Sequence, residues 1–398
     1  MAAGEPKLTL LGKVVVIAVV GACLYGAYAL FARRTSLTPV PPGTQGEEPT
    51  LAGLGDSEIG LAYGTEKQRW LEWAAQEFQK TKAGKKTKVN LIPKGSLEGA
   101  QAILSQDKRI HIWSPASAVY KDVFVQDWQA KFGNNPILKE ETLALSPMVF
   151  VFWKERYDAF KSKMGAVTFQ TISAALAEKS GWQGIAGKPE WGFFKLGHTH
   201  PNQSNSGLVT LVLAAYSFHN KTRNMQLQDI LDVNFQTWLQ AMERGVSGLS
   251  NSTGNMMKEM VLKGPSSFDA LFVYENVAID YMKNAEGRWG QLQVIYPDKN
   301  MWNENPYYII DAPWSSSEQR KAAAEFLNFL MSEPVQKEAL SHGFRPGNPN
   351  VPIKFPGSLF ETYAPFGIRV DVGAVCEPPR AEVVNNLLAG WQRSQGVR

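Results

Sequence analysis

The stretch Gly197-His198-Thr199-His200-Pro201-Asn202-Gln203-Ser204-Asn205-Ser206-Gly207-Leu208 runs directly into an apolar segment. Small polar residues ahead of such a segment are typical of a helix N-terminus. A helix N-terminus presents unpaired backbone N–H groups and the positive end of the helix dipole, so it can bind a carboxylate, phosphate or other oxyanion. The residues leave two interpretations open: Ser204 and Asn205 only cap the helix, or they help to bind a ligand.

The length and composition indicate a two-lobed globular protein. A chain of 398 residues exceeds one ordinary core and predicts two lobes of roughly 100–200 residues each. A formal net charge of +4, with no basic block, argues against nucleic acid as a partner. The two cysteines, Cys23 and Cys376, exclude a disulfide framework and a thiolate metal cluster.

The N-terminal residues 1–34 are predicted to anchor the chain in the cytoplasmic membrane. The segment 14–32 is almost wholly apolar and long enough to cross a bilayer as one transmembrane helix. A lipoprotein signal with acylation at Cys23 is the alternative, because Val20-Gly21-Ala22-Cys23 loosely matches its small-residue pattern. Both interpretations tether the protein to a membrane.

Residues 35–55 are predicted to be a linker. They are rich in Pro and Gly and show neither a helical nor a strand period. A folded domain that begins at residue 56 would thus stand off the membrane while staying close to it.

The segment 58–113 alternates strands with helices, which is the βαβ pattern of a parallel sheet. Small polar turns follow the strands, at the edge where open α/β sheets bind ligands. Thr65 with Gln68, and later Ser315 with Glu318, predict capping boxes at two helix starts. The predicted elements are strands 58–63, 88–93 and 110–113 and helices 66–80 and 97–106.

Two crossings are predicted to join the lobes. The apolar stretch 142–153 leads into a second lobe with helices at 168–178, 207–218, 227–243 and 256–262 and a strand at 270–274. A return segment from 292 leads back, and a last helix spans 381–392. We therefore expect lobe 1 to comprise 56–146 and 298–398, and lobe 2 to comprise 147–297.

Signals for catalysis are weak. The glycine-rich segment 181–189 differs from a phosphate-binding loop in its spacing and in Pro189, and no Gly-x-Ser-x-Gly elbow occurs. His198 and His200, with Glu275 or Asp311, would be needed for a metal site, as in a metal-dependent hydrolase. Histidines in a loop are more often plain polar surface. We therefore expect no enzyme activity, no catalytic residue, no cofactor and no bound metal.

Binding without chemistry explains more of the sequence. Neutral donors occur in several loops of both lobes, as coordination of a small polar or anionic ligand requires. Each of them has a simpler explanation as a local cap, but together they follow successive strand ends. They are Thr65, Ser114, Ser117, Ser146, Thr199, Ser204, Asn205 and Ser206.

Several motifs between Glu58 and Gln392 resemble the type II periplasmic solute-binding proteins of ABC-type uptake systems. The resemblance is to the molybdate-like binding domain branch, which is often associated with von Willebrand factor A domains. The motifs are Ile112-Trp113-Ser114-Pro115-Ala116-Ser117, Leu145-Ser146-Pro147-Met148-Val149, 194–208, Ser252-Thr253-Gly254, Val273-Tyr274-Glu275-Asn276, Asp311-Ala312-Pro313-Trp314 and Gly343-Phe344-Arg345-Pro346.

This resemblance implies a periplasmic-binding-protein-like α/β fold whose two lobes, joined by two crossovers, close on a ligand. It adds Glu275 to the eight predicted cleft residues, although this carboxylate would repel an oxyanion unless it is neutralised. The implied function is extracytoplasmic capture of a solute for an ABC permease. The alternative is a scaffold in a surface complex with a separate von Willebrand factor A protein, because the sequence shows no such domain.

Overall fold

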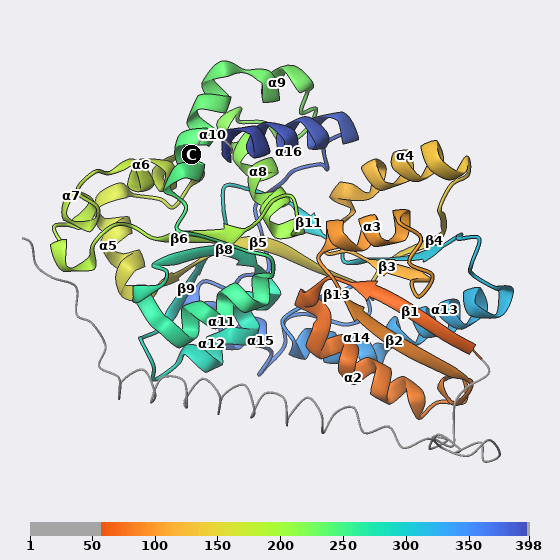
Figure 1. Ribbon diagram of the computed structural model, residues 1–398. Helices are drawn as coiled ribbons and strands as arrows, with labels where there is room; N and C mark the ends of the chain where they lie inside the picture. The colour runs from red at the N-terminus through yellow and green to blue at the C-terminus, as the bar shows by residue number, and fades with distance from the viewer. Residues whose placement is uncertain (1–56, 396–398) are drawn as a thin grey trace, which may run out of the picture. The chain divides into compact units, whose positions relative to one another are not determined.

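The computed structural model describes residues 57–395 (Figure 1). The predicted anchor (1–34), the predicted linker (35–55) and the lipoprotein alternative at Cys23 lie outside the described residues. Among the helices of the described part, none is both long enough and apolar enough to cross a membrane.

The first sheet has five strands in the order β2-β1-β3-β12-β4. Strand β1 pairs in parallel with β2 and β3, whereas β12 is antiparallel to β3 and β4. The predicted βαβ pattern is thus confirmed, and β12 joins the sheet from the return segment. The strands are β1 Ser57–Tyr63, β2 Thr87–Pro93, β3 Ile112–Ser114, β4 Ile137–Thr142 and β12 Pro306–Ile310.

Both faces of β1 are buried. Ile59, Leu61 and Tyr63 point to one core and Ala62 to another, as the period of two in a strand requires. Helices α2, α13 and α14 supply the first core, and α3 and α4 supply part of the second. Each large side chain buried in these cores contributes about 1.5–3 kcal/mol. The helices are α2 Gln68–Gln79, α3 Ser96–Leu104, α4 Lys121–Phe132, α13 Ser317–Leu330 and α14 Glu333–Ser341.

The second sheet is built on the long strand β5, which is antiparallel to β8 and β9. Strand β6 is parallel to β8 on one side and to β7 on the other. Two short strands, β11 and β13, pair with the start of β5. The strands are β5 Ala144–Trp153, β6 Leu196–Thr199, β7 Gly248–Ser250, β8 Ala270–Tyr274, β9 Leu292–Ile295, β11 Trp302–Asn303 and β13 Arg345–Pro346.

Two chain segments connect strands of the two sheets, as predicted, and the chain passes between the halves once more after α14. Strand β5 follows β4 after one residue and runs from the edge of the first sheet into the second (Figure 1). The chain returns from β9 through β11 to β12, and β11 pairs with β5 at Ser146 and Pro147. The two crossings therefore lie side by side.

The remaining helices surround the second sheet. Helix α8 is buried along nearly its whole length, which explains its continuous apolar sequence. The helices are α5 Lys154–Met164, α6 Phe169–Ala177, α7 Trp182–Ala186, α8 Asn205–Phe218, α9 Leu227–Leu231, α10 Val233–Gly245, α11 Thr253–Lys263, α12 Glu275–Ala285 and α15 Leu359–Thr362.

The C-terminal segment reaches both halves. Strand β14 (Ala374–Val375) pairs with β10 (Lys299–Asn300), and helix α16 (Ala381–Gln395) follows. Helix α16 contacts α8, α9 and α10 of the second half and also α4 of the first. The end of the chain thus packs across the two halves.

Three local predictions were wrong. The box at Thr65 and Gln68 does not form, because residues 65–67 make a 3-10 turn and α2 begins only at Gln68. The second box lies one residue later, at Ser316 and Gln319. The helix predicted over 227–243 is two helices, because Asp232 ends α9 and its side chain caps α10.

Candidate ligand-binding site

The candidate site lies where strand ends of the first sheet meet helix starts of the second half. Gly64, directly after β1, donates its backbone N–H to Ser114 O at the end of β3, at 3.0 Å. Opposite them are the ends of β6 and β7 and the N-termini of α8 and α11. The polar turns after parallel strands therefore converge here, as the sequence pattern predicts.

A hydrogen bond between Ser117 and Asn205 joins the two halves. Ser117 Oγ donates to Asn205 Oδ1 at 2.8 Å, and both side chains are buried. Asn205 Nδ2 donates in turn to Tyr274 OH at 3.0 Å and to Asn303 Oδ1 at 3.2 Å. Asn205, the first residue of α8, thus uses its side chain to connect three elements.

Four hydroxyl groups form a buried cluster beneath the N-terminus of α8. Ser206 Oγ lies 2.6 Å from Thr199 Oγ1, 2.7 Å from Thr253 Oγ1 and 3.3 Å from Ser204 Oγ. Ser204 occupies the N-cap position but makes no side-chain cap, so simple capping does not explain it. The cluster ties β6, α8 and α11 together.

A second contact between the halves lies at the edge of a small hollow. Thr65 Oγ1 is 3.3 Å from Ser252 Oγ. The hollow has a volume of about 130 Å³ and is lined by residues of both halves, including Thr65, Glu66, Ser252 and Asn276. Space for a small ligand or for ordered water is therefore present at the junction.

Ser146 and Ser114 have contrasting surroundings. Ser146 Oγ donates to Asn276 Oδ1 at 2.8 Å and accepts from Asn276 N at 3.1 Å, so it fixes the start of α12. Ser114 is fully buried and its Oγ has no hydrogen-bond partner among the described residues. An unpaired buried hydroxyl costs stability, so the hydrogen-bonding capacity of Ser114 is unused by the described protein groups.

Glu275, the residue after Tyr274, forms an ion pair with Arg345. Arg345 Nε and Nη2 donate to its two carboxylate oxygens at 2.8 and 2.7 Å, and Tyr296 OH also donates to it. Both charged side chains are buried. Glu275 thus has a countercharge, which removes the repulsion expected for an anionic ligand.

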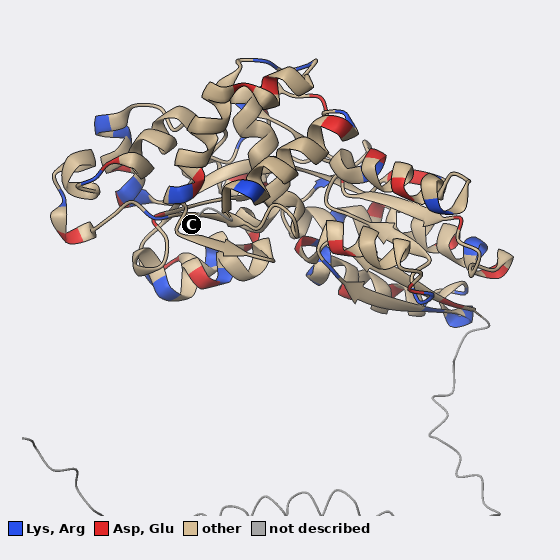
Figure 2. Ribbon diagram, turned by 45° about the horizontal axis from the view of Figure 1, so that its top comes forward, with Lys and Arg blue, Asp and Glu red and all other residues tan. Residues whose placement is uncertain are grey.

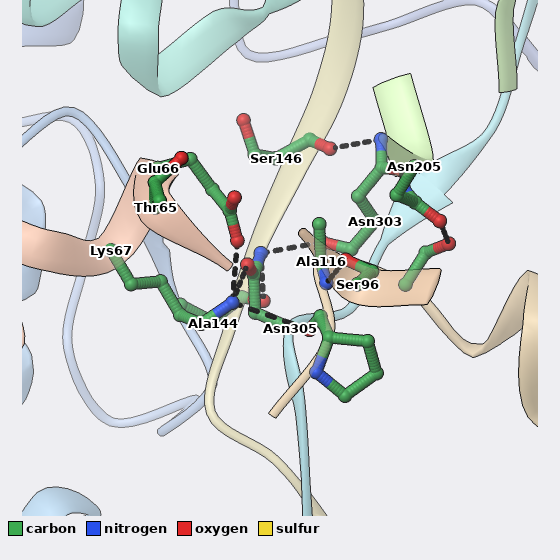
Figure 3. A network of polar contacts seen from close by, with 12 residues as sticks. Thr65, Glu66, Lys67, Ser96, Ala116, Ala144, Ser146, Asn205, Asn303 and Asn305 are labelled. Carbon is green, nitrogen blue, oxygen red and sulfur yellow. Dashed lines mark hydrogen bonds and ion pairs between the residues drawn. The ribbon is translucent and has the colours of Figure 1, made fainter. Parts of the chain in front are cut away.

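Residues that sequence reasoning missed complete the polar network (Figure 3). Lys67 is fully buried, and its ammonium donates to Glu66 Oε1 at 2.5 Å, to Asn305 Oδ1 at 3.0 Å and to Pro115 O at 3.2 Å. Burial lowers the pKa of Lys67, and the carboxylate of Glu66 opposes that effect. The only local signal was the position of Glu66 and Lys67 shortly after the end of β1.

His198 and His200 point to different partners. His198 is buried, with Nε2 3.0 Å from Glu243 Oε1 and Nδ1 2.8 Å from Thr199 O. The ring of His200 instead packs edge-on against Trp391. Within residues 57–395, no group of three or more His, Cys, Asp or Glu residues is arranged to hold a metal ion.

Charges outside the site are mixed. Figure 2 shows Lys and Arg interspersed with Asp and Glu over the helices of both halves. The electrostatics of the junction are therefore set locally, by groups such as Lys67 and Glu66, rather than by a charged face of the molecule.

Two α/β halves, joined by two crossings and lined at their junction with polar side chains, define a two-lobed ligand-binding protein. The sequence of residues 59–345 matches the family described as bacterial extracellular solute-binding protein. The chain belongs to this family. No curated protein sequence matches it significantly.

Solved structures share the fold at low sequence identity. A periplasmic thiamin binding protein is 12% identical, with a TM-score of 0.57 over 90% of this chain and 99% of that chain. The ferric binding protein from Campylobacter jejuni is 12% identical, with a TM-score of 0.56 over 85% and 99%. The sulfate-binding protein from Mycobacterium tuberculosis is 16% identical, with a TM-score of 0.53 over 86% and 99%.

Proposed function

We propose that this protein captures a small polar or anionic solute by closing its two lobes, and that it delivers the solute to an ABC-type permease. One observation carries the proposal: Ser117 of one half and Asn205 of the other are joined by a buried hydrogen bond in the middle of a polar network. Buried polar groups at a junction are costly unless they bind one another or a ligand.

The ligand-binding set that we propose is the one predicted from the sequence. Ser117, Asn205, Thr65 and the hydroxyl cluster lie at the junction, and the unpaired Ser114 hydroxyl lies at a strand end beside them. Ser146 and Glu275 are fully engaged by protein groups, so we assign them supporting roles in that set. We add Lys67 to the set because its side chain is fully buried.

The division into lobes stays a proposal. Residues 56–146 with 298–398 and residues 147–297 are the two bodies expected to move, with β5 and the return segment as the connection. Helix α16 belongs to the first of these bodies and contacts α8, α9 and α10 of the second, so these contacts would change on opening. Anchoring of the extracytoplasmic domain by residues 1–34 is likewise proposed from the sequence.

Related folds support a range of small ligands. The names of the similar structures include sulfate-, thiamin- and ferric-binding proteins, so the fold serves chemically different solutes. A scaffold role with a von Willebrand factor A protein is not favoured, because the matched family is described by solute binding. Such a partner remains a prediction for a pull-down experiment.

Native mass spectrometry of full-length protein purified without denaturation tests the proposal. We expect an added mass of a small molecule that is lost after unfolding and refolding. The variant Asn205→Ala should carry less of it, whereas Ser162→Ala, on the exposed face of α5, should match the wild type. The proposal fails if the wild type carries no ligand and none of a panel of solutes adds mass to the refolded protein.

A further inference from the structure

The buried ammonium of Lys67 donates to three oxygen acceptors. Two of its three acceptors are fixed neutral oxygens: Pro115 O belongs to the backbone, and Asn305 is held because its Nδ2 donates to Ala144 O and Asn303 O. The third acceptor, the carboxylate of Glu66, is the countercharge, at 2.5 Å. A buried ammonium needs such a partner, because burial without one is costly.

The carboxylate of Glu66 reaches this position by folding back over the preceding turn. A Cβ atom at Gly64 would lie 2.3 and 2.5 Å from the two oxygens of Glu66, so a side chain at position 64 would displace this carboxylate. Adjacent residues in a helical turn do not ordinarily face each other. The contact between Glu66 and Lys67 is thus a specific placement of a carboxylate group.

The side chain of Glu66 borders open space. Its side chain is 7% exposed, against 0% for Lys67, and it lines the hollow of about 130 Å³ beside Thr65 and Ser252. Turning the side chain into the hollow would free the ammonium for another anion. Tyr274, whose pKa is raised by burial and further by the nearby charge of Glu66, borders the same position.

We propose that Glu66 occupies the position on Lys67 that the carboxylate group of the bound solute takes, so the solute class is a small carboxylate. This inference rests on the proposed capture function and narrows its ligand. A carboxylate is favoured over other anions because the group already placed there is a carboxylate with matching donors. In the absence of solute, Glu66 supplies the countercharge of Lys67 and opposes the lowering of its pKa by burial.

The test is rescue of Glu66→Ala by acetate in the full-length protein. We expect about 100 mM sodium acetate to raise the Tm of Glu66→Ala by about 2 °C relative to sodium chloride at equal ionic strength. Acetamide, which has the same shape without the charge, should give no such rise. The wild type and Glu72→Ala, which removes an exposed acid from the following helix α2, should respond to acetate as to chloride.

Two further variants test whether the acetate response depends on Lys67 and on the charge of Glu66. The pair Glu66→Ala with Lys67→Met should lose the acetate response. If Glu66→Ala does not fold, Glu66→Gln, which keeps the volume and removes the charge, should show a larger acetate response than the wild type. The inference is overturned if the response equals that of the wild type or persists without Lys67.

This outcome is separable from that of the capture function. Scattering measurements on the same samples report closure by the retained solute. If the lobes close on that solute while the Glu66 variants ignore acetate, the capture function stands and the carboxylate assignment fails. If acetate rescues Glu66→Ala while no solute closes the lobes, the anion position stands and capture fails.

Discussion

Ser117 Oγ and Asn205 Oδ1 lie 2.8 Å apart, and they connect the end of β3 in one half with the start of α8 in the other. The two residues are 88 positions apart in the sequence. Asn205 also donates to Tyr274 and Asn303, so its side-chain amide connects three partners at the junction.

Removing the Asn205 side-chain amide should lower the free energy of unfolding. Asn205→Ala leaves the partner groups Ser117 and Asn303 buried and without that amide, which costs about 1–3 kcal/mol of unfolding free energy. Ser117→Ala loses one of these bonds and should cost about 1 kcal/mol. Urea denaturation measures both values. The exposed control Ser162→Ala should change the free energy of unfolding by less than about 0.5 kcal/mol. Equal values for Asn205→Ala and this control would refute the stabilising role of the Asn205 amide.

The buried ion pair of Glu275 and Arg345 should be structural. Glu275→Gln leaves the Arg345 guanidinium buried without its countercharge, which costs about 3–5 kcal/mol. The exposed pair of Glu259 and Lys263 is the matched control, and Glu259→Gln should cost less than about 1 kcal/mol. Chemical denaturation measures the free energy of unfolding of both variants. A small loss for Glu275→Gln would show that the ion pair contributes little to stability.

Protonation of His198 should stabilise the fold at low pH. Burial alone lowers the pKa of His198, but the charge and hydrogen bond of Glu243 and the bond to Thr199 raise it overall. Since the folded pKa exceeds the usual value of 6.5, this stabilisation is complete below about pH 6.5 and is lost as pH rises through the raised pKa. Both ring nitrogens face oxygen acceptors, as the doubly protonated form requires.

The unfolding free energies of the wild type and His198→Gln, measured between about pH 5.5 and pH 9, check this dependence. Their difference should be largest at the acidic end and should shrink as the pH rises. In a Glu243→Gln background the pH-dependent part of the difference should be reduced. A constant or increasing difference with pH would contradict the assigned sign.

Gly207 should be intolerant of a side chain. A Cβ atom there would lie 2.1 Å from Thr199 O and 2.8 Å from Pro201 N, so Gly207→Ala must displace backbone at the junction. We expect a loss of about 1–3 kcal/mol. Gly254 is the matched glycine in the first turn of α11, where the nearest atom to an added Cβ is Ser252 Oγ at 4.0 Å.

Gly254→Ala should therefore be neutral or stabilise by up to about 1 kcal/mol, because alanine favours helix. Thermal unfolding of both variants measures the contrast. Equal effects of the two substitutions would show that the close packing of Gly207 on the β6 loop does not limit stability.

The arrangement of strands was predictable because it follows from local patterns. Alternating side chains in β1, the long apolar strand β5 and the helix that starts near Gly207 carry their signals within a few residues. The positions of Thr65 and Ser117 at strand ends followed from the same patterns. Predicting these positions required no knowledge of long-range contacts.

The detailed partners were not predictable because they lie far apart in the sequence. Thr65 contacts Ser252 at a separation of 187 residues, and Lys67 contacts Asn305 at a separation of 238. A lysine at the start of an amphipathic helix is ordinarily solvated, so its burial has no local signal. The partner of Glu275 lies 70 residues onward, at Arg345.

Closure around a solute is the central claim, and small-angle X-ray scattering of the unit Gly53–Arg398 tests it most directly. The natively purified protein is compared with the same protein after unfolding, dialysis and refolding, and then with the solute added back. The account predicts a larger radius of gyration after the solute is stripped and a return to the compact value when it is restored. An unchanged radius of gyration in all three samples, with solute binding verified by mass, would contradict capture by lobe closure.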